Sequence, residues 1–253
     1  MPVDPPFICP HPCRPKLPLT TAASAKAVLL FDLDGTLIDD GRVTGPAVQE
    51  ALDELDLPGT PPVERFRALS GIALLRILRL LDLPPELQPP YVQAMTRLIV
   101  QGAAVTFRGM EVVLRAQHER GLPVAVVTNK DRRRSRMALQ ATGLAPWVDV
   151  LLTPSETAQK PGPDMLLAAC ARLGIAPDRA VMIGDSTTDL RSARAAGIDT
   201  IACIWGAGTR RDLAAEQPRW LVEQPAALAA LLGRITVPAA HGQRSLLLPG
   251  GHA

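Results

Sequence analysis

The stretch AVLLFDLDGTL, residues 27–37, decides the fold because it joins a buried strand to a pair of acidic residues. The apolar run 27–30 is typical of a strand that is buried on both faces of a parallel sheet. Asp32 and Asp34 follow where this strand should end, and side chains two residues apart in an extended chain share a face. Open α/β proteins place their chemistry at this carboxyl edge. Two crowded carboxylates destabilise a fold unless a cation or a shared proton relieves their repulsion, so the pair predicts a functional site.

The composition indicates a globular chain with a small-molecule partner. Its 253 residues allow a single domain, with or without an insertion. Hydrophobic residues make up 47% and aromatic residues only 3%, which predicts a core of Leu, Val, Ile and Ala. The net charge of +2 is too small to indicate a nucleic-acid partner. The sequence contains no membrane-spanning run, no signal peptide and no disulfide framework, so we expect a cytoplasmic protein with no membrane partner.

Both ends of the chain are expected to be tails. Residues 1–25 are rich in proline, and residues 237–253 contain both glycine and proline, which predicts disorder. Cys9, His11 and Cys13 offer three soft ligands without a second cluster, so the sequence does not favour a metal site there. Cys170 and Cys203 lie in apolar surroundings and are predicted to be core residues.

Strand-like and helix-like segments alternate along the remaining chain. After the first strand we predict strands at 124–128, 148–152, 180–184 and 200–204, separated by helices at 111–120, 132–142, 164–173 and 188–196. Gly121, Gly143, Gly174 and Gly197 stand where helices commonly end, and Asp131 is a suitable N-cap. This alternation predicts an α/β fold with a doubly wound, Rossmann-like parallel sheet, formed by residues 26–40 and 108–236.

Residues 41–107 interrupt the alternation and are called the helical insertion below. They show helical periodicity and no convincing strand, and the leucine-rich run 74–81 is dense enough to be largely buried. Because this segment leaves the chain just after the aspartate pair, we expect it to form an α-helical cap domain over the pair.

Three further polar motifs follow predicted strands. Thr128-Asn129 closes the strand at 124–128, Lys160 follows the strand at 148–152, and GDSTTD (residues 184–189) follows the strand at 180–184. Each motif is weak alone, but Lys160 is one of only four lysines in the chain. In this order and at successive strand ends, the set is highly specific.

These motifs resemble the haloacid dehalogenase superfamily of phosphotransferases, in the branch with a helical cap inserted after the first motif. Within that branch the chain is most similar to phosphoglycolate-phosphatase-like enzymes. The resemblance extends from about residue 27 to residue 232 and leaves out only the two tails.

The resemblance implies a catalytic role for each motif. Asp32 would be the nucleophile that forms an aspartyl-phosphate, and Asp34 would protonate the leaving group and later activate water. Thr128 and the backbone N–H of Asn129 would hold phosphoryl oxygens. Lys160 would bridge the phosphate and Asp32.

The resemblance also implies a Mg²⁺ cofactor. Asp185 would bind the ion together with the Asp32 carboxylate and the Asp34 carbonyl, and Asp189 would be a further ligand or would act behind the first ligands. Four aspartates and a phosphate dianion against one lysine would leave a closed site strongly negative without a cation. Asp189 can also be explained as an acid in the first turn of a helix.

The basic residues near these motifs leave two alternatives open. Arg67 lies in a segment that resembles the family's substrate-facing segment, and it either meets an anionic substrate group or is an exposed helix arginine. Lys130 either adds charge near the phosphate or points to solvent. The arginine run 132–134 favours a solvated helix face.

The sequence therefore predicts a Mg²⁺-dependent phosphatase that hydrolyses a small anionic phosphomonoester, with 2-phosphoglycolate as the leading candidate. One alternative is a phosphomutase of the β-phosphoglucomutase type. Another is a non-catalytic regulator on the same fold. The sequence leaves open whether the protein is a monomer or a homodimer.

Overall fold

The computed structural model describes residues 27–69 and 71–236. The tails predicted at 1–25 and 237–253 lie outside these residues, and so do Cys9 and Cys13. Cys170 and Cys203 are buried free thiols, as predicted.

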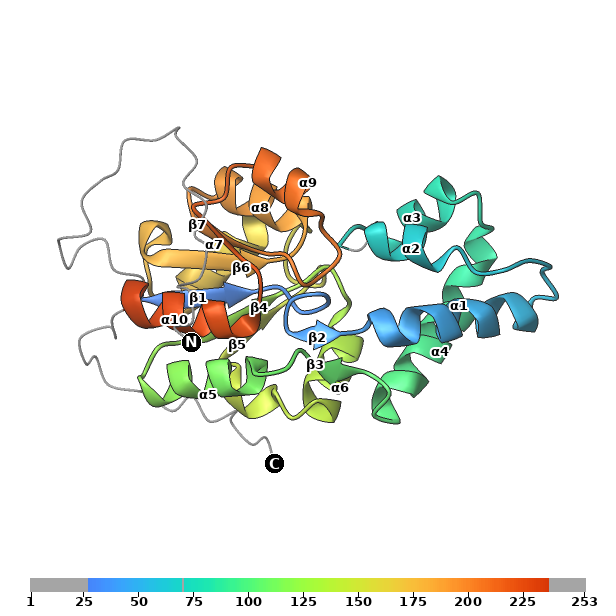
Figure 1. Ribbon diagram of the computed structural model, residues 1–253, viewed down its shortest axis with the longest axis horizontal. Helices are drawn as coiled ribbons and strands as arrows, with labels where there is room; N and C mark the ends of the chain where they lie inside the picture. The colour runs from blue at the N-terminus through green and yellow to red at the C-terminus, as the bar shows by residue number, and fades with distance from the viewer. Residues whose placement is uncertain (1–26, 70, 237–253) are drawn as a thin grey trace, which may run out of the picture.

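A six-stranded parallel sheet forms the centre of the molecule, in the order β5-β4-β1-β6-β7-β8 (Figure 1). The five strands expected from the sequence are all present, with small shifts at their ends. The eighth strand, next to β7 at one edge, is not among the predicted ones. The strands are β1 (Val28–Phe31), β4 (Val124–Val127), β5 (Val150–Leu152), β6 (Ala180–Gly184), β7 (Asp199–Cys203) and β8 (Trp220–Val222).

Helices cover both faces of this sheet, which confirms the doubly wound α/β fold. Leu29 and Phe31 of β1 belong to the same buried cluster as residues of α5 and α10, whereas Val28 and Leu30 pack with α7 and α8. This division follows the alternation of side chains along a strand. The helices around the sheet are α5 (Met110–Glu119), α6 (Arg132–Ala141), α7 (Asp164–Arg172), α8 (Thr187–Ala195), α9 (Arg210–Ala215) and α10 (Pro225–Ile235), with 3₁₀ turns η3 (Ala145–Trp147) and η4 (Pro177–Arg179).

The helix ends agree with the sequence signals. The Asp131 carboxylate accepts a hydrogen bond of 3.0 Å from the backbone N–H of Arg134 and so caps α6. The four glycines expected at helix C-termini all have positive φ, between 65° and 73°.

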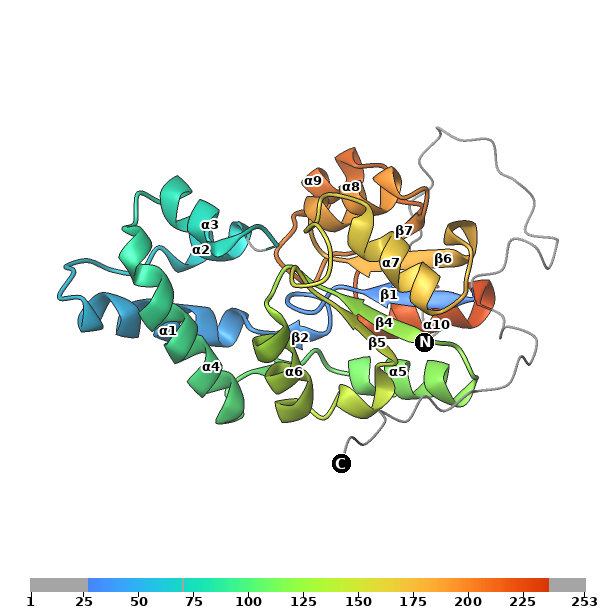
Figure 2. The same cartoon turned by 180° about the vertical axis from the view of Figure 1, so that it is seen from behind.

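The helical insertion stands beside the sheet as a separate group of helices (Figures 1 and 2). Its α1 and α4 pack against each other along their lengths. A two-stranded antiparallel ribbon, β2 (Ile38–Asp39) with β3 (Val105–Thr106), joins the group to the rest of the chain. The insertion contains α1 (Gly41–Glu54), α2 (Val63–Ala68), α3 (Leu74–Leu80), η2 (Pro85–Leu87) and α4 (Gln88–Val100).

Two predictions for this segment are wrong. The segment does contain a strand, because β3 pairs with β2 where the chain returns to the sheet. The leucine-rich run is only partly buried: Ile77, Leu78 and Leu81 are buried, but Leu75 and Leu80 are each 48% exposed. The seven residues of α3 make about two turns of helix and bury one face, so leucines on the opposite side face water.

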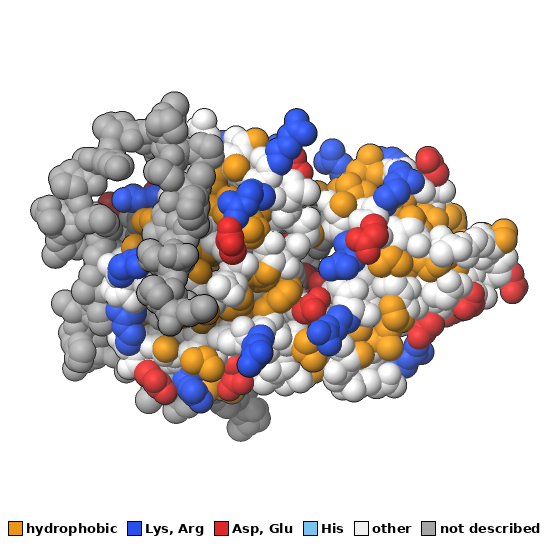
Figure 3. Space-filling model, viewed as in Figure 1, with side chains coloured by type: hydrophobic (Ala, Val, Ile, Leu, Met, Phe, Trp, Pro, Cys, Tyr) orange, Lys and Arg blue, Asp and Glu red, His pale blue; other side chains and the backbone are white. Residues whose placement is uncertain are grey.

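Acidic and basic side chains are interspersed on the face of the molecule displayed in Figure 3, which agrees with the low net charge. Among the residues that the structure describes, no helix is both long enough and apolar enough to span a bilayer.

Candidate active site

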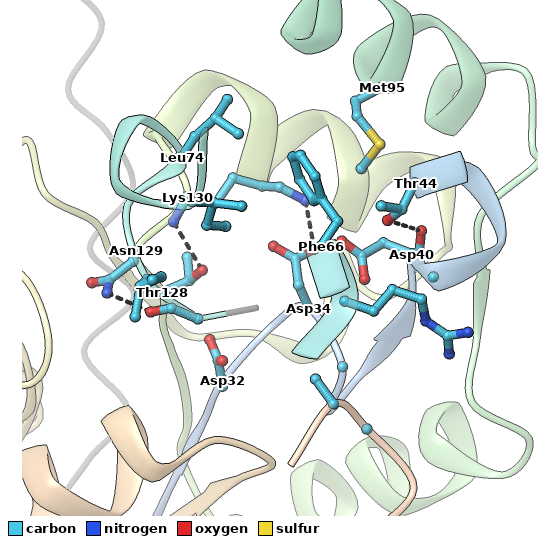
Figure 4. A pocket seen from close by; sticks show the side chains of 18 of the residues that line it. Asp32, Asp34, Asp40, Thr44, Phe66, Leu74, Met95, Thr128, Asn129 and Lys130 are labelled. Atoms are coloured by element: carbon cyan, nitrogen blue, oxygen red, sulfur yellow. Dashed lines mark hydrogen bonds and ion pairs between the residues drawn. The ribbon is translucent and has the colours of Figure 1, made fainter. Parts of the chain in front are cut away.

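The carboxyl ends of β1, β4 and β6 meet at one edge of the sheet and bring the predicted motifs together. The backbone N–H of Asp32 donates to the Ile183 carbonyl at 2.9 Å, so Asp32 still lies in the hydrogen-bonding pattern of the sheet. The backbone N–H of Thr128 donates in the same way to the Leu152 carbonyl at 3.1 Å. The resulting cavity, with Asp32, Asp34 and Thr128 in its wall, is shown in Figure 4.

Asp32 is buried, and its two carboxylate oxygens differ. Oδ1 accepts a hydrogen bond from the backbone N–H of Leu33 at 2.8 Å and lies 2.9 Å from Lys160 Nζ. Within the described part of the chain, Oδ2 has no hydrogen-bond donor. Burial raises the pKa of Asp32 to about 7, helped by the negative charge of Asp189 and opposed by Lys160. Oδ2 is therefore the oxygen of Asp32 that can accept a further contact.

Lys160 is a buried cation whose ammonium group has three partners. Nζ donates to the Val127 carbonyl at 2.8 Å and to Asp189 Oδ1 at 2.7 Å, besides its contact with Asp32. Burial disfavours the charge, but Asp189 and Asp32 outweigh this effect and raise the pKa of Lys160. Lys160 is therefore held firmly beside Asp32.

Both carboxylate oxygens of Asp189 are occupied. Oδ1 accepts from Lys160, while Oδ2 accepts from the Ser186 backbone N–H at 3.1 Å and from the Ser186 hydroxyl at 2.6 Å. Ser186 and Asp189 form a capping box at the start of α8. The helix-capping explanation for Asp189 is thus correct, and the same side chain also orients Lys160.

Asp185 lies where two other chain segments approach it closely. Its Oδ1 accepts from the Thr36 hydroxyl at 2.8 Å, and its Oδ2 accepts from the Ala207 backbone N–H at 2.8 Å. A Cβ atom on Gly35 or on Gly206 would lie only 2.2 Å from Asp185 Oδ2. These two glycines let the backbone surround the carboxylate.

Three carboxylates form a group that could hold a cation. One oxygen from each of Asp32, Asp185 and Asp189 lies within 4.8 Å of the others, and all three residues are buried. Burial raises the pKa of Asp185 well above its usual value, and the charges of Asp32 and Asp189 raise it further. A cation would relieve this repulsion. The Asp34 carboxylate is not one of these three carboxylates. The ligand predicted from Asp34 is its backbone carbonyl.

Thr128 and Asn129 lie at the cavity wall, as expected, and the Asn129 side chain makes three hydrogen bonds of its own. Its amide nitrogen donates to the carbonyls of Gly71 and Lys160, both at 3.0 Å, and its amide oxygen accepts from the Lys160 backbone N–H at 2.9 Å. Asn129 therefore connects the helical insertion to the loop that carries Lys160.

Lys130 points into the cavity, which resolves the alternative that the sequence leaves open. Nζ lies 2.5 Å from Asp34 Oδ1, and the side chain is only 8% exposed (Figure 4). The neighbouring arginines 132 and 134 pair with Glu156 and Asp131, and Arg134 also reaches the cavity wall. The arginine run is thus not simply a solvated face.

The cavity has a volume of about 150 Å³, and the helical insertion supplies much of its wall. Arg67 reaches this wall, although its side chain is 47% exposed and lies 3.7 Å from Glu64. Asp40 and Tyr91 also line the cavity. Burial and the charge of Asp34 raise the pKa of Asp40 to about 7, while Lys130 opposes the shift.

Sequence reasoning misses Asp40 and Tyr91. Asp40 precedes α1 and reads as an ordinary N-cap, yet its side chain does not cap the helix. The sequence feature that could have indicated a cavity position for Asp40 is the pair of adjacent acids, Asp39 and Asp40, shortly after the first motif. For Tyr91, the one tyrosine in the chain, the signal is its rarity.

Comparison with known proteins identifies the family. The family model of the haloacid dehalogenase-like hydrolases matches residues 29–203, and the chain belongs to this family. The predicted family, fold class and hydrolase class are therefore confirmed.

The curated relatives share most of their length with this chain. N-acetylmuramic acid 6-phosphate phosphatase of Pseudomonas aeruginosa is 34% identical over 218 residues, which cover 78% of this chain and 93% of the relative. Phosphoglycolate phosphatase of Xylella fastidiosa is 32% identical over 211 residues, covering 78% and 89%. Pyrophosphatase PpaX of Bacillus pumilus is 30% identical over 209 residues, covering 81% and 95%.

Solved structures agree with this assignment. A hydrolase from Pseudomonas syringae is 25% identical and superposes with a TM-score of 0.71, covering 83% of this chain and 99% of the other. A haloacid dehalogenase family hydrolase from Deinococcus radiodurans, with bound phosphate and sodium, is 25% identical with a TM-score of 0.69, covering 85% and 100%.

Proposed function

We propose that the protein is a Mg²⁺-dependent phosphatase that hydrolyses a small anionic phosphomonoester through an aspartyl-phosphate on Asp32. The observation that carries this proposal is the asymmetry of the Asp32 carboxylate. Lys160 and the Leu33 N–H hold Oδ1, while Oδ2 has no donor within the described residues. A nucleophile needs one oriented oxygen and one free lone pair.

The chemistry divides into two proton-balanced steps. In the first step, Asp32 Oδ2 bonds to phosphorus, the bond from phosphorus to the ester oxygen breaks, and protonated Asp34 gives its proton to that oxygen. In the second step, Asp34 takes a proton from water, the water oxygen bonds to phosphorus, and Asp32 leaves. Asp34, which is two residues from Asp32 and lines the cavity, can serve both steps.

Thr128 and Lys160 are proposed to hold the phosphoryl oxygens. Thr128 is buried at the cavity wall, and its hydroxyl oxygen accepts a hydrogen bond of 3.2 Å from the Lys130 backbone N–H, so its own proton is free to donate. Lys160 would stabilise the charge that develops on the phosphoryl group. The Asn129 backbone N–H is proposed as a further donor.

The donor set fits a Mg²⁺ ion. Buried carboxylate oxygens with raised pKa values are hard ligands that a divalent cation would neutralise. We propose the carboxylates of Asp32 and Asp185 and the Asp34 carbonyl as ligands. Asp189 would not bind the ion directly but would orient Lys160 beside it. When bound, Mg²⁺ would offset phosphoryl charge and orient the ester.

The substrate proposal rests on the names of the relatives and on the basic residues of the cavity. Relatives named as phosphoglycolate phosphatases make 2-phosphoglycolate the leading candidate. Arg67, Lys130 and Arg134 all reach the cavity wall and favour an anionic ligand. The helical insertion is proposed to act as a cap that excludes water, and the buried free thiols support a cytoplasmic setting.

Phosphate release from a panel of esters tests the proposal. The panel contains 2-phosphoglycolate, sugar phosphates, nucleotides and p-nitrophenyl phosphate, each with Mg²⁺ and with a chelator. Chelator-sensitive turnover that Asp32→Asn abolishes would support the phosphatase. Conversion of a sugar phosphate to its isomer would instead indicate a phosphomutase, and silence across the panel from folded protein would favour a non-catalytic regulator.

A further inference from the structure

We propose that Lys130 recognises a carboxylate on the leaving group of the substrate. The inference rests on the proposed function, in which Asp34 is the general acid. It assigns to Lys130 the discrimination between substrates, a task for which Arg67 is the expected residue.

Lys130 is placed rigidly at the leaving-group side of the cavity. It lies between Asn129, whose amide is hydrogen-bonded on both sides, and Asp131, which caps α6. From there its side chain extends into the cavity to Asp34 Oδ1 at 2.5 Å, with 8% exposure for the lysine and 18% for the aspartate (Figure 4). An ammonium in this position is shielded from bulk water.

The ammonium group of Lys130 has donors to spare. It carries three N–H groups, and among the described residues Asp34 is the one acceptor within hydrogen-bond distance of Nζ. The charges of Asp40 and Asp131 also act on the ammonium, but neither carboxylate is hydrogen-bonded to it. A carboxylate on the substrate would accept from the remaining donors.

The reach of the ammonium group fits a carboxylate close to the ester. In a phosphorylated 2-hydroxy acid, two bonds separate the ester oxygen from the carboxylate carbon. Asp34 must come within hydrogen-bond distance of that ester oxygen to protonate it. Lys130 Nζ, which already contacts Asp34, is therefore within reach of the carboxylate.

The other cations at the cavity wall are less suitable. Lys160 already donates to three acceptors beside the phosphoryl site. Arg67 is 47% exposed, and a Cβ on Gly41 would lie 2.9 Å from its Nε, so its guanidinium packs against the start of α1. Arg134 is paired with Asp131.

Binding to an inactive background tests the inference without turnover. In Asp32→Asn protein, isothermal titration calorimetry would compare 2-phosphoglycolate with inorganic phosphate, which shares only the phosphoryl group. We expect Lys130→Met to weaken 2-phosphoglycolate binding about 10- to 100-fold, as for a charged hydrogen bond, and phosphate binding less than about 3-fold. Lys130→Arg should restore part of the loss, and Arg67→Met tests the competing assignment of the carboxylate to that arginine.

Steady-state kinetics on a matched pair of esters completes the test. Ethyl phosphate has the same heavy-atom spacing at the ester but no carboxylate. We expect Lys130→Met to lower kcat/KM for 2-phosphoglycolate about 10- to 100-fold while ethyl phosphate changes less than about 3-fold.

Three results would overturn the inference. Equal losses on both esters would mean that Lys130 only positions Asp34, and a selective loss in Arg67→Met alone would assign the carboxylate to Arg67. Turnover of ethyl phosphate by unaltered protein without preference for 2-phosphoglycolate would refute the inference but leave the phosphatase intact. Absence of turnover on either ester and on p-nitrophenyl phosphate would refute the proposed function itself.

Discussion

The side-chain amide of Asn129 donates a hydrogen bond of 3.0 Å to the carbonyl of Gly71, and this contact joins the sheet to the helical insertion. The same nitrogen donates to the Lys160 carbonyl. One amide thus holds together the segment that covers the cavity and the loop that positions the buried lysine.

Asn129→Asp is expected to break this connection. A carboxylate would face two carbonyl oxygens where the amide donated, and we expect a loss of about 1–3 kcal/mol in unfolding free energy. Hydrogen exchange of residues 71–74 should become faster. Gln140→Glu is the control, because Gln140 is exposed on α6 and makes the same change of charge. Unchanged exchange at 71–74 in Asn129→Asp would contradict the role of the amide.

Gly71→Ala should impair activity far more than an equivalent change elsewhere in the insertion. A Cβ at Gly71 would lie 2.9 Å from Ser186 Oγ, whereas at Gly102, which has a similar φ (81° against 88°), it would meet nothing within 4 Å. Both alanines should cost about 1 kcal/mol of stability. Only Gly71→Ala should also lower kcat/KM, by about 10-fold or more. Equal activity of the two variants would show that the approach of Gly71 to Ser186 is unimportant.

Asp189→Asn should destabilise the protein by about 3 kcal/mol, because it removes one partner of a buried ion cluster and weakens the cap of α8. Asp212 provides a matched comparison. It pairs with the N-cap Thr209 of α9 at 2.6 Å but is exposed. Asp212→Asn should cost less than about 1 kcal/mol. Urea unfolding measures both, and similar values for the two variants would contradict the buried role of Asp189.

Asp40→Asn should stabilise the protein at high pH and leave it unchanged at low pH. The pKa of Asp40 is raised from 3.8 to about 7, so its favourable contribution to the folded state is complete below about pH 4 and disappears as pH rises through about 7. Above pH 7 the variant should gain up to about 4 kcal/mol. Unfolding at about pH 4 and pH 8 measures this difference. Glu86→Gln, at an exposed acid, is the control, and a gain that is equal at both pH values would refute the explanation.

Magnesium should stabilise the protein more at about pH 8 than at about pH 5. The pKa of Asp32 is raised to about 7 and that of Asp185 is raised well above its usual value, so protons compete with the cation at acidic pH. The increase in Tm on adding Mg²⁺ should therefore grow across this range and should be abolished by Asp185→Ala. An increase that is independent of pH would argue that Mg²⁺ binds elsewhere.

The sequence predicts the sheet and the polar motifs at its carboxyl edge well because both depend on local signals. Apolar runs, capping residues and polar motifs at strand ends place Asp32, Thr128 and Asp185 without knowledge of the packing. The direction of the Lys130 side chain depends on where Asp34 lies in three dimensions. Likewise, Asp40 reads as a helix cap until the folded chain shows its carboxylate free of the helix.

Asp189 illustrates a further limit of prediction. Its position three residues after Ser186 is a readable capping box, yet the sequence cannot show that its other oxygen holds Lys160. The exposure of two leucines on α3 could not be predicted either. The periodicity of a seven-residue helix does not show clearly which face is buried.

The ribbon of β2 and β3 has an evolutionary consequence. The chain leaves the sheet and returns to it side by side, with Ile38 paired to Thr106 and Asp39 to Val105. The chain therefore enters and leaves the insertion at one place, so the length or sequence of the insertion can change without changing the register of the sheet. One contiguous stretch of the gene thus encodes much of the cavity wall that faces the aspartates, and it can vary without altering the strands that carry Asp32 and Thr128.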